Sequence, residues 1–144
     1  MTELEKVFAY GHEKVLCTHN TTIELTKDDF LTERGTCILG INASKACYDL
    51  TPKLKSKIQS GYKFKISINA EGTSDSFYGY GNPNLKLLNN KDMVFRKSSF
   101  ICDRTVLINC TKASNELSRE LINKLKISGK KFSLIFDTTD VDGP

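Results

Sequence analysis

The stretch Ile41-Asn42-Ala43-Ser44-Lys45-Ala46 occurs a second time in the chain, as Ile108-Asn109-Cys110-Thr111-Lys112-Ala113. Each copy follows a continuous apolar run and precedes a segment in which apolar residues recur at helical spacing. A pattern that returns in this way is the mark of a duplicated structural unit. These two stretches therefore decide the architecture that we expect.

Further matches extend the repeat away from the two stretches. Tyr10-Gly11 returns as Tyr80-Gly81, and the apolar phase agrees where identities fail. The chain has 144 residues, enough for one buried core, whereas each half alone would be marginal. We expect one domain over residues 1–144, built of two repeats at about 7–70 and 77–138 that share a core.

Apolar runs and alternation predict short strands in both copies. The expected strands are 7–10, 15–19, 23–25, 37–41 and 64–68 in the first copy, and 85–88, 93–95, 105–108 and 132–136 in the second. Residues 71–84, rich in Gly, Ser and aromatics, are expected to be a linker between the copies.

Each copy also contains one stretch with helical periodicity. Residues 43–58 predict a helix that kinks or restarts at Thr51-Pro52, a good cap followed by a first-turn proline. Residues 110–125 predict the equivalent helix without interruption, and Gly61 would end the first one.

The fold class that follows is α+β. Internally duplicated βββαβ units are expected to form a pseudo-twofold β-barrel or wrapped sheet with two equivalent helices, because short alternating strands favour a closed or nearly closed sheet. A pair of ferredoxin-like units is the alternative.

Composition and charge describe an ordinary globular chain, with 26% charged residues, 39% apolar residues and a net charge of +4. No apolar run approaches the ~18 residues of a membrane span, and the amino terminus lacks a signal-peptide pattern. We therefore expect a cytoplasmic protein with no membrane partner. The five cysteines are odd in number and form no CxxC pair, so they predict core residues without disulfides.

The starts of the two expected helices suggest anion binding. Ser44 and Thr111 would be N-caps, and each is followed by a lysine, Lys45 or Lys112. The exposed N–H groups of a helix start, with a lysine and a preceding asparagine, suit an anion. The other ligand-binding candidates are Asn42, Asn109, Arg34, Arg104, Arg96 and Lys97.

The alternative interpretation is that these lysines point into solvent and that the arginines form salt bridges. A lysine that only opposes the helix dipole would cost stability, so replacing it by Glu would stabilise the fold by about 0.3–1 kcal/mol.

Histidines occur only in the first copy, as His12 and His19. With Cys17 they suggest zinc, but no fourth ligand stands at a recognised spacing, so no metal site is expected. His19 is a weak candidate for a general acid or base oriented by Glu24. Cys17 and Cys37 lack any nucleophile motif.

The stretch Tyr78-Gly79-Tyr80-Gly81 is a glycine–aromatic strip that could stack nucleic-acid bases. It fits equally well an ordinary turn whose tyrosines cover the edge of the core.

A resemblance to a known family lies in the stretches Gly11-His12, His19-Asn20-Thr21-Thr22-Ile23-Glu24, Thr32-Glu33-Arg34-Gly35-Thr36-Cys37, Arg96-Lys97-Ser98-Ser99-Phe100 and Arg104-Thr105. With these stretches, and over roughly residues 5–138, the chain resembles an archaeal family of domains of unknown function, numbered 371. The resemblance implies an archaeal cytoplasmic protein and carries over no catalytic residue. The family often has Asp after the glycine where this chain has Thr36, so it implies no acid there.

Three functions remain open at this point. The first is a module that binds an anionic ligand, nucleic acid or a phosphorylated molecule, at the two helix starts. The second is a small enzyme acting on a phosphorylated or carboxylate metabolite with His19 as acid or base. The third is a structural subunit of a larger complex. The sequence assigns no cofactor and no oligomeric state.

Overall fold

The computed structural model describes residues 2–138. Its elements are β1 (Thr2–Tyr10), β2 (Thr22–Thr26), β3 (Ile38–Gly40), α1 (Pro52–Gln59), β4 (Lys63–Ala70), β5 (Thr73–Tyr80), β6 (Asp92–Arg96), β7 (Thr105–Leu107), α2 (Arg119–Leu125) and β8 (Lys131–Thr138). Short 3-10 turns, η1 (Cys47–Asp49) and η2 (Ser114–Glu116), precede the two helices. The order βββαβ thus occurs twice along the chain.

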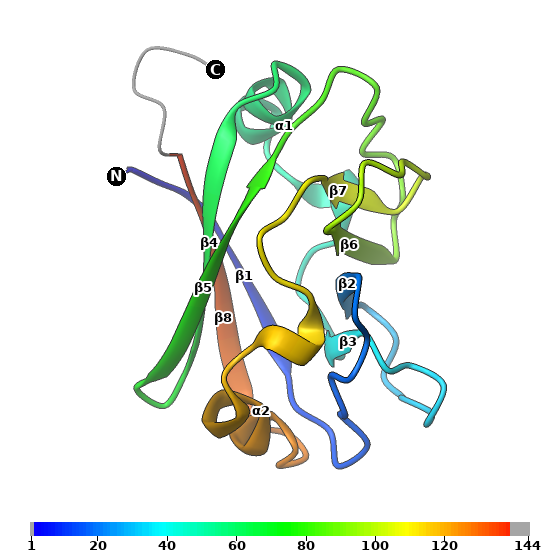
Figure 1. The fold of residues 1–144 in the computed structure, drawn as a ribbon, viewed down its shortest axis with the longest axis vertical. Helices are drawn as coiled ribbons and strands as arrows, with labels where there is room; N and C mark the ends of the chain where they lie inside the picture. The colour runs from blue at the N-terminus through cyan, green and yellow to red at the C-terminus, as the bar shows by residue number, and fades with distance from the viewer. Residues whose placement is uncertain (1, 139–144) are drawn as a thin grey trace.

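The strands form two four-stranded sheets that face each other (Figure 1). The antiparallel sheet has the order β1-β8-β4-β5. The mixed sheet has the order β3-β2-β6-β7, with β2 and β6 antiparallel at its centre and β3 and β7 parallel to their neighbours. Helices α1 and α2 lie at opposite ends of the molecule, at the top and bottom of the view (Figure 1).

One apolar core lies between the sheets and contains residues from both halves of the chain. The ring of Phe95, from the mixed sheet, is 5.5 Å from that of Phe77 and 5.9 Å from that of Phe136, both in the antiparallel sheet. Such ring pairs contribute about 0.5–1.5 kcal/mol beyond their buried area. The two sheets are therefore held together by aromatic packing across the core.

The expected α+β class is confirmed, but the expected barrel is wrong. Within residues 2–138 the only β-bridges between the two sheets are two isolated ones, Tyr10 with Ile41 and Tyr80 with Ile108. Asn42 and Asn109 follow these bridges with φ of 51°, a left-handed conformation that stops an extended ladder. The ferredoxin-like alternative does not fit either, because the strands divide between two sheets.

Two expected strands, 15–19 and 85–88, are irregular loops. Cys17 and Leu87 have φ of 51° and 56°, which breaks an extended run in its middle. The alternation that suggested strands has another cause: side chains of these loops, such as Val15 and Leu85, point into the core.

The expected linker 71–84 contains strand β5, so this prediction is also wrong. Glu71 and Gly72 have φ of 49° and 81°, and Ala70 pairs with Thr73 across them. Two central residues with positive φ make the type I′ turn that joins hairpin strands. The turn sends the chain straight back along β4 as β5.

Both helices are shorter than expected and begin later. Helix α1 begins after the N-cap Thr51, whose hydroxyl accepts from the N–H of Leu54, so the predicted restart at Thr51-Pro52 is confirmed. Helix α2 begins after the N-cap Ser118, so the uninterrupted helix 110–125 is wrong. Among residues 2–138, no helix combines the length and the apolar composition that crossing a bilayer requires.

Candidate functional site

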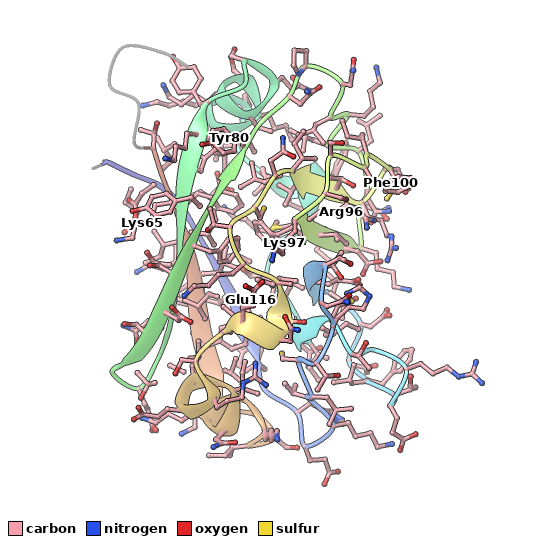
Figure 2. The ribbon with its side chains drawn as sticks, viewed as in Figure 1. Lys65, Tyr80, Arg96, Lys97, Phe100 and Glu116 are labelled. Carbon is pink, nitrogen blue, oxygen red and sulfur yellow. The ribbon has the colours of Figure 1, made fainter. Side chains whose placement is uncertain are left out.

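The outer face of the antiparallel sheet is the most distinctive surface of the molecule. Along β4 and β8, core residues such as Phe64 and Phe136 alternate with side chains that point away from the mixed sheet. The residues of this open face include four lysines and four aromatics: Lys6, Lys63, Lys65, Lys131, Phe8, Tyr10, Tyr78 and Tyr80. Lys65 projects from the left of the sheet, where none of the described elements covers it (Figure 2).

One group of these residues, the β4–β5 cluster, consists of Lys63, Lys65, Tyr78 and Tyr80. Lys63 faces Tyr80 and Lys65 faces Tyr78 across the two strands. The ammonium of Lys63 lies 4.9 Å from the ring centroid of Tyr78 and 5.9 Å from that of Tyr80. Cation and ring therefore lie side by side at one corner of the sheet.

A second group, the β1–β8 cluster, consists of Lys6, Phe8, Tyr10 and Lys131. Phe8 is exposed, and the ammonium groups of Lys131 and Lys6 lie 4.3 Å and 5.9 Å from its ring centroid. Tyr10 faces Lys131 across the strands. The opposite corner of the sheet thus carries the same combination of groups.

The rest of the open face carries neutral side chains between the two clusters and two acidic side chains beside them. Ser67, Ile135 and Ser76 occupy the row between the clusters. The acids of the face are Glu3 on β1 and Asp137 on β8, which face each other, and Asp137 also faces Lys65 on β4. The face is therefore net basic, with its positive charge and its rings along one diagonal.

The repeated stretch has a structural role, which the sequence did not show. Ser44 accepts a hydrogen bond from the N–H of Phe8 through its hydroxyl (2.9 Å), and Thr111 accepts from the N–H of Tyr78 in the same way (2.9 Å). β1 and β5 are the edge strands of the antiparallel sheet. Each copy therefore satisfies an edge strand that would otherwise be unpaired.

The expected N-caps at Ser44 and Thr111 are consequently wrong, and the adjacent lysines have protein partners. Lys45 donates to Glu5 (2.7 Å), whose side chain is only 3% exposed. Glu5 also accepts from the N–H of Thr51 (3.0 Å) and from its hydroxyl (2.7 Å), at the start of α1. The anion at this helix start is thus a carboxylate of the chain itself.

Lys112 repeats this arrangement at the other helix. It donates to Asp75 (2.7 Å), which also accepts from the N–H of Ser118 (2.8 Å) at the start of α2. Burial alone would raise the pKa of Asp75, but the hydrogen bonds from Lys112 and Ser118 lower it below its ordinary value. The carboxylate is therefore held in its charged form.

The remaining candidates of the two helix starts are scattered. The N–H groups of Asn42 and Asn109 donate to Asp28 and Ser98, in the left-handed turns described above. Arg34 is exposed in the loop between β2 and β3. The structure does not bring these residues to one site.

Lys97, another candidate, is engaged at the surface. It donates to Glu116 (2.7 Å), and Figure 2 shows the two side chains near each other at the centre of the view. Glu116 also accepts from the N–H of Ala113 (3.0 Å) in the turn before α2. The side chains of Lys97 and Glu116 are both partly exposed, so water and salt screen this pair and it adds little to stability.

One arginine and two acids meet on the outer side of the mixed sheet. Arg104 lies 3.4 Å from Glu24 and 3.8 Å from Asp92, and both carboxylates are buried. Burial raises the pKa of Glu24, and the charge of Asp92 raises it further, against the opposing charge of Arg104. One oxygen of Asp92 (Oδ1) is buried and receives no hydrogen bond.

Arg96 contacts Cys102, a cysteine that the sequence had not singled out. Its guanidinium donates to the thiol sulfur of Cys102 (3.2 Å) and to the hydroxyl of Thr105 (3.0 Å), and it stacks on Phe100 at 4.9 Å. Thr105 donates to the same sulfur (3.6 Å). Burial alone would raise the pKa of Cys102, but bonds from the Arg104 N–H, Thr105 and Arg96 lower it to about 7.

This environment predicts a measurable difference in thiol reactivity between Cys102 and the buried cysteines. At pH 7 Cys102 is expected to react first with a disulfide reagent such as dithiobis-nitrobenzoate, because only a thiolate attacks. Its rate should rise as the pH increases from 6 to 8, through the pKa of about 7. In Cys17, Cys47 and Cys110 burial raises the pKa to about 12, so they should stay silent without denaturant.

The matched control is Cys102→Ser, which should remove the fast reaction. If the folded Cys102→Ser variant still contained a fast-reacting thiol, the assignment of this reactivity to Cys102 would be contradicted.

The histidine candidates are not assembled into a catalytic or metal site. The Nδ1 of His19 accepts a hydrogen bond from the N–H of Thr21 (3.2 Å) and lies 3.0 Å from the Thr22 hydroxyl. Glu24 instead contacts Cys37 and Arg104. Cys17 donates to a backbone carbonyl, and all five cysteines are free. Within residues 2–138, no three His, Cys, Asp or Glu side chains gather as a metal site requires.

Sequence reasoning missed most of the open face because it missed β5. The signal was available in Glu71-Gly72, a turn dipeptide between two alternating segments, and in the spacing of Tyr78 and Tyr80. The glycine–aromatic strip had suggested base stacking, and its tyrosines do lie on an open face.

Comparison with known proteins places the chain among uncharacterised relatives. A family described as a domain of unknown function, DUF371, matches residues 7–139. An uncharacterised protein of Methanocaldococcus jannaschii is 44% identical over 128 residues, which cover 89% of this chain and 93% of that protein.

Proposed function

This chain belongs to the DUF371 family, and we propose that it binds single-stranded nucleic acid on the open face of the antiparallel sheet. The observation that carries the proposal is the pairing of lysines with the exposed rings of Tyr80 and Phe8 at two corners of that face. Single-stranded nucleic acid offers phosphates for the lysines and base faces for the rings.

The energies favour this ligand. An exposed cation–π contact such as that of Lys131 with Phe8 is worth about 0.5–1 kcal/mol. A base stacked on an aromatic side chain contributes about 1–3 kcal/mol. A base can therefore displace the ammonium from the ring, and the freed lysine is then within reach of the adjacent phosphate.

The proposal is tested by binding of a labelled oligouridylate of about 16 nucleotides, measured by fluorescence anisotropy. If four lysines contact phosphates, log K should fall with log salt with a slope of about −3. The double variant Lys65→Glu, Lys131→Glu should bind at least about tenfold more weakly, with a slope smaller by about 1.4. The same measurement with oligothymidylate distinguishes RNA from DNA.

The matched control is Lys14→Glu, Lys86→Glu, which makes the same charge change at two exposed loop positions outside the open face. It should keep nearly all of the affinity. An equal loss in both double variants would mean that net charge alone attracts the ligand, and the proposal would fail. Stronger binding of duplex than of single strands would also contradict it.

Anion binding at Lys45 and Lys112 remains a weaker proposal. Glu5 and Asp75 already pair with these lysines, so a phosphate would have to displace a carboxylate of the chain. The enzyme alternative with His19 and Glu24 has the support of the raised Glu24 pKa but not of a contact between the two side chains.

One observation favours the third alternative, a structural subunit. Phe30, Phe100 and Leu88 are 59%, 61% and 64% exposed, which is unusual for large apolar side chains. A stable partner that buries them would appear as a complex of larger mass when the protein is purified from its native host.

We also propose that the chain arose by duplication of one βββαβ unit and lies in the cytoplasm as a single domain. The repeated element order, the paired bridges at Ile41 and Ile108 and the two lysine–carboxylate pairs support the duplication. Superposing residues 10–70 on 80–138 should give one near-twofold rotation.

A further inference from the structure

We propose that the two clusters of the open face bind one and the same nucleic-acid strand, which crosses the antiparallel sheet diagonally and is held at both ends. This inference rests on the proposed function and adds to it the path and the minimum length of the ligand. A ligand that reaches only one cluster would bind weakly at either of two sites.

The strand register places the clusters at opposite corners. Lys63 and Tyr80 form the last row at one end of β4 and β5, and Tyr10 and Lys131 form the last row at the other end of β1 and β8. The rows between them span about 27 Å at ~3.4 Å per residue, and the edge strands lie ~14 Å apart at ~4.8 Å per strand. The diagonal is therefore on the order of 30 Å.

The residues along and beside this diagonal favour one path. Ser67, Ser76 and Ile135 lie between the clusters and carry no charge, so a strand can pass over them. Glu3 at the β1 edge and Asp137 beside it on β8 would repel phosphates on that side of the sheet. Lys65 on β4 stands between Asp137 and Tyr78, so the acids lie beside the diagonal and not on it. The other diagonal ends at these acids, so only one diagonal suits a polyanion.

The two ends are built alike. Lys63 lies 4.9 Å from the ring of Tyr78, and Lys131 lies 4.3 Å from the ring of Phe8. Each end thus supplies one ring and one cation for a base and its phosphate. When one strand engages both ends, the second contact is intramolecular, and affinity rises by about 10²–10⁴-fold over a single contact.

The test compares oligouridylates of about 4 and about 12 nucleotides, of which only the longer can span the diagonal. The wild-type protein should bind the longer one at least about 100-fold more tightly. Two matched variants each remove the closest ring–cation pair of one end: Lys63→Gln, Tyr78→Thr at one corner and Phe8→Thr, Lys131→Gln at the other. Each should remove most of the length advantage while weakening the short oligonucleotide only about twofold, since one end remains.

The outcomes separate this inference from the proposed function. If the wild-type protein binds neither oligonucleotide, the proposed function fails. If one variant abolishes binding of both lengths and the other changes nothing, the protein binds nucleic acid at one cluster only, and the diagonal path is overturned. Should an aromatic variant fail to fold, Lys63→Gln and Lys131→Gln alone give the same comparison, because both side chains point away from the core.

Discussion

Replacing Lys45 by Glu is expected to destabilise the protein by about 3–5 kcal/mol. The change removes the cation from Glu5, whose side chain is 3% exposed, and places a second carboxylate beside it. Thr51 alone would then stabilise the buried charge through its N–H and its hydroxyl. Thermal unfolding followed by circular dichroism should show a Tm lower by about 10–20 °C.

The matched control for this prediction is Lys130→Glu. Lys130 pairs with Glu71, whose side chain is 63% exposed, so solvent screens the pair and the same change should lower the Tm far less than Lys45→Glu does. The sequence alone had suggested the opposite effect of Lys45→Glu on stability. The change would have been stabilising, because it removes a cation that opposes the helix dipole. A Lys45→Glu protein that melts at or above the wild type would support that earlier interpretation and contradict the ion pair.

A methyl group added at Gly81 is expected to cost about 3 kcal/mol. The Cβ of an alanine there would lie 1.9 Å from the carbonyl oxygen of Ile58 and 2.7 Å from its carbon. These are backbone atoms at the end of α1, so they cannot move aside as a side chain would. Urea unfolding of Gly81→Ala should show a lower midpoint with an unchanged m-value.

Gly61→Ala provides the comparison. Gly61 has φ of 83° and open space around it, so alanine there adds backbone strain of about 1 kcal/mol but no clash. If both variants lose the same stability, the close approach of Gly81 to α1 is not the reason for its glycine.

The repeat of Tyr10-Gly11 as Tyr80-Gly81 can now be explained. Gly11 meets the carbonyl of Leu125 at the end of α2 as Gly81 meets that of Ile58 at the end of α1. Each glycine thus lets a strand end pass directly under a helix end. The sequence displayed the repeat but could not show this reason, because the two partners are far apart along the chain.

Predictions that depended on local pattern mostly succeeded. The alternation of Phe64, Ile66 and Ile68 predicted β4, and Thr51-Pro52 predicted the start of α1. Alternation failed at Cys17 and Leu87, where buried side chains stand on a backbone with positive φ. Periodicity records which side chains are buried and does not record whether the backbone is paired.

Predictions that depended on distant partners failed for a different reason. Nothing near Lys45 indicates that Glu5, on the first strand, is its partner. The open face was hidden in the same way, since Lys131 and Phe8 come from opposite ends of the chain. Arg104 and Glu24 were each noted as candidates, but only the fold shows that they meet.

The position of β8 has a consequence for biosynthesis. β8 is hydrogen-bonded on both sides, to β1 and to β4, although it follows both of them along the chain. A nascent chain that ends before Lys131 therefore displays two bare strand edges, the kind that associate with other chains. Contacts between such distant segments also form slowly. The antiparallel sheet is therefore completed only once β8 has been made, and its exposure to aggregation lasts until that strand inserts.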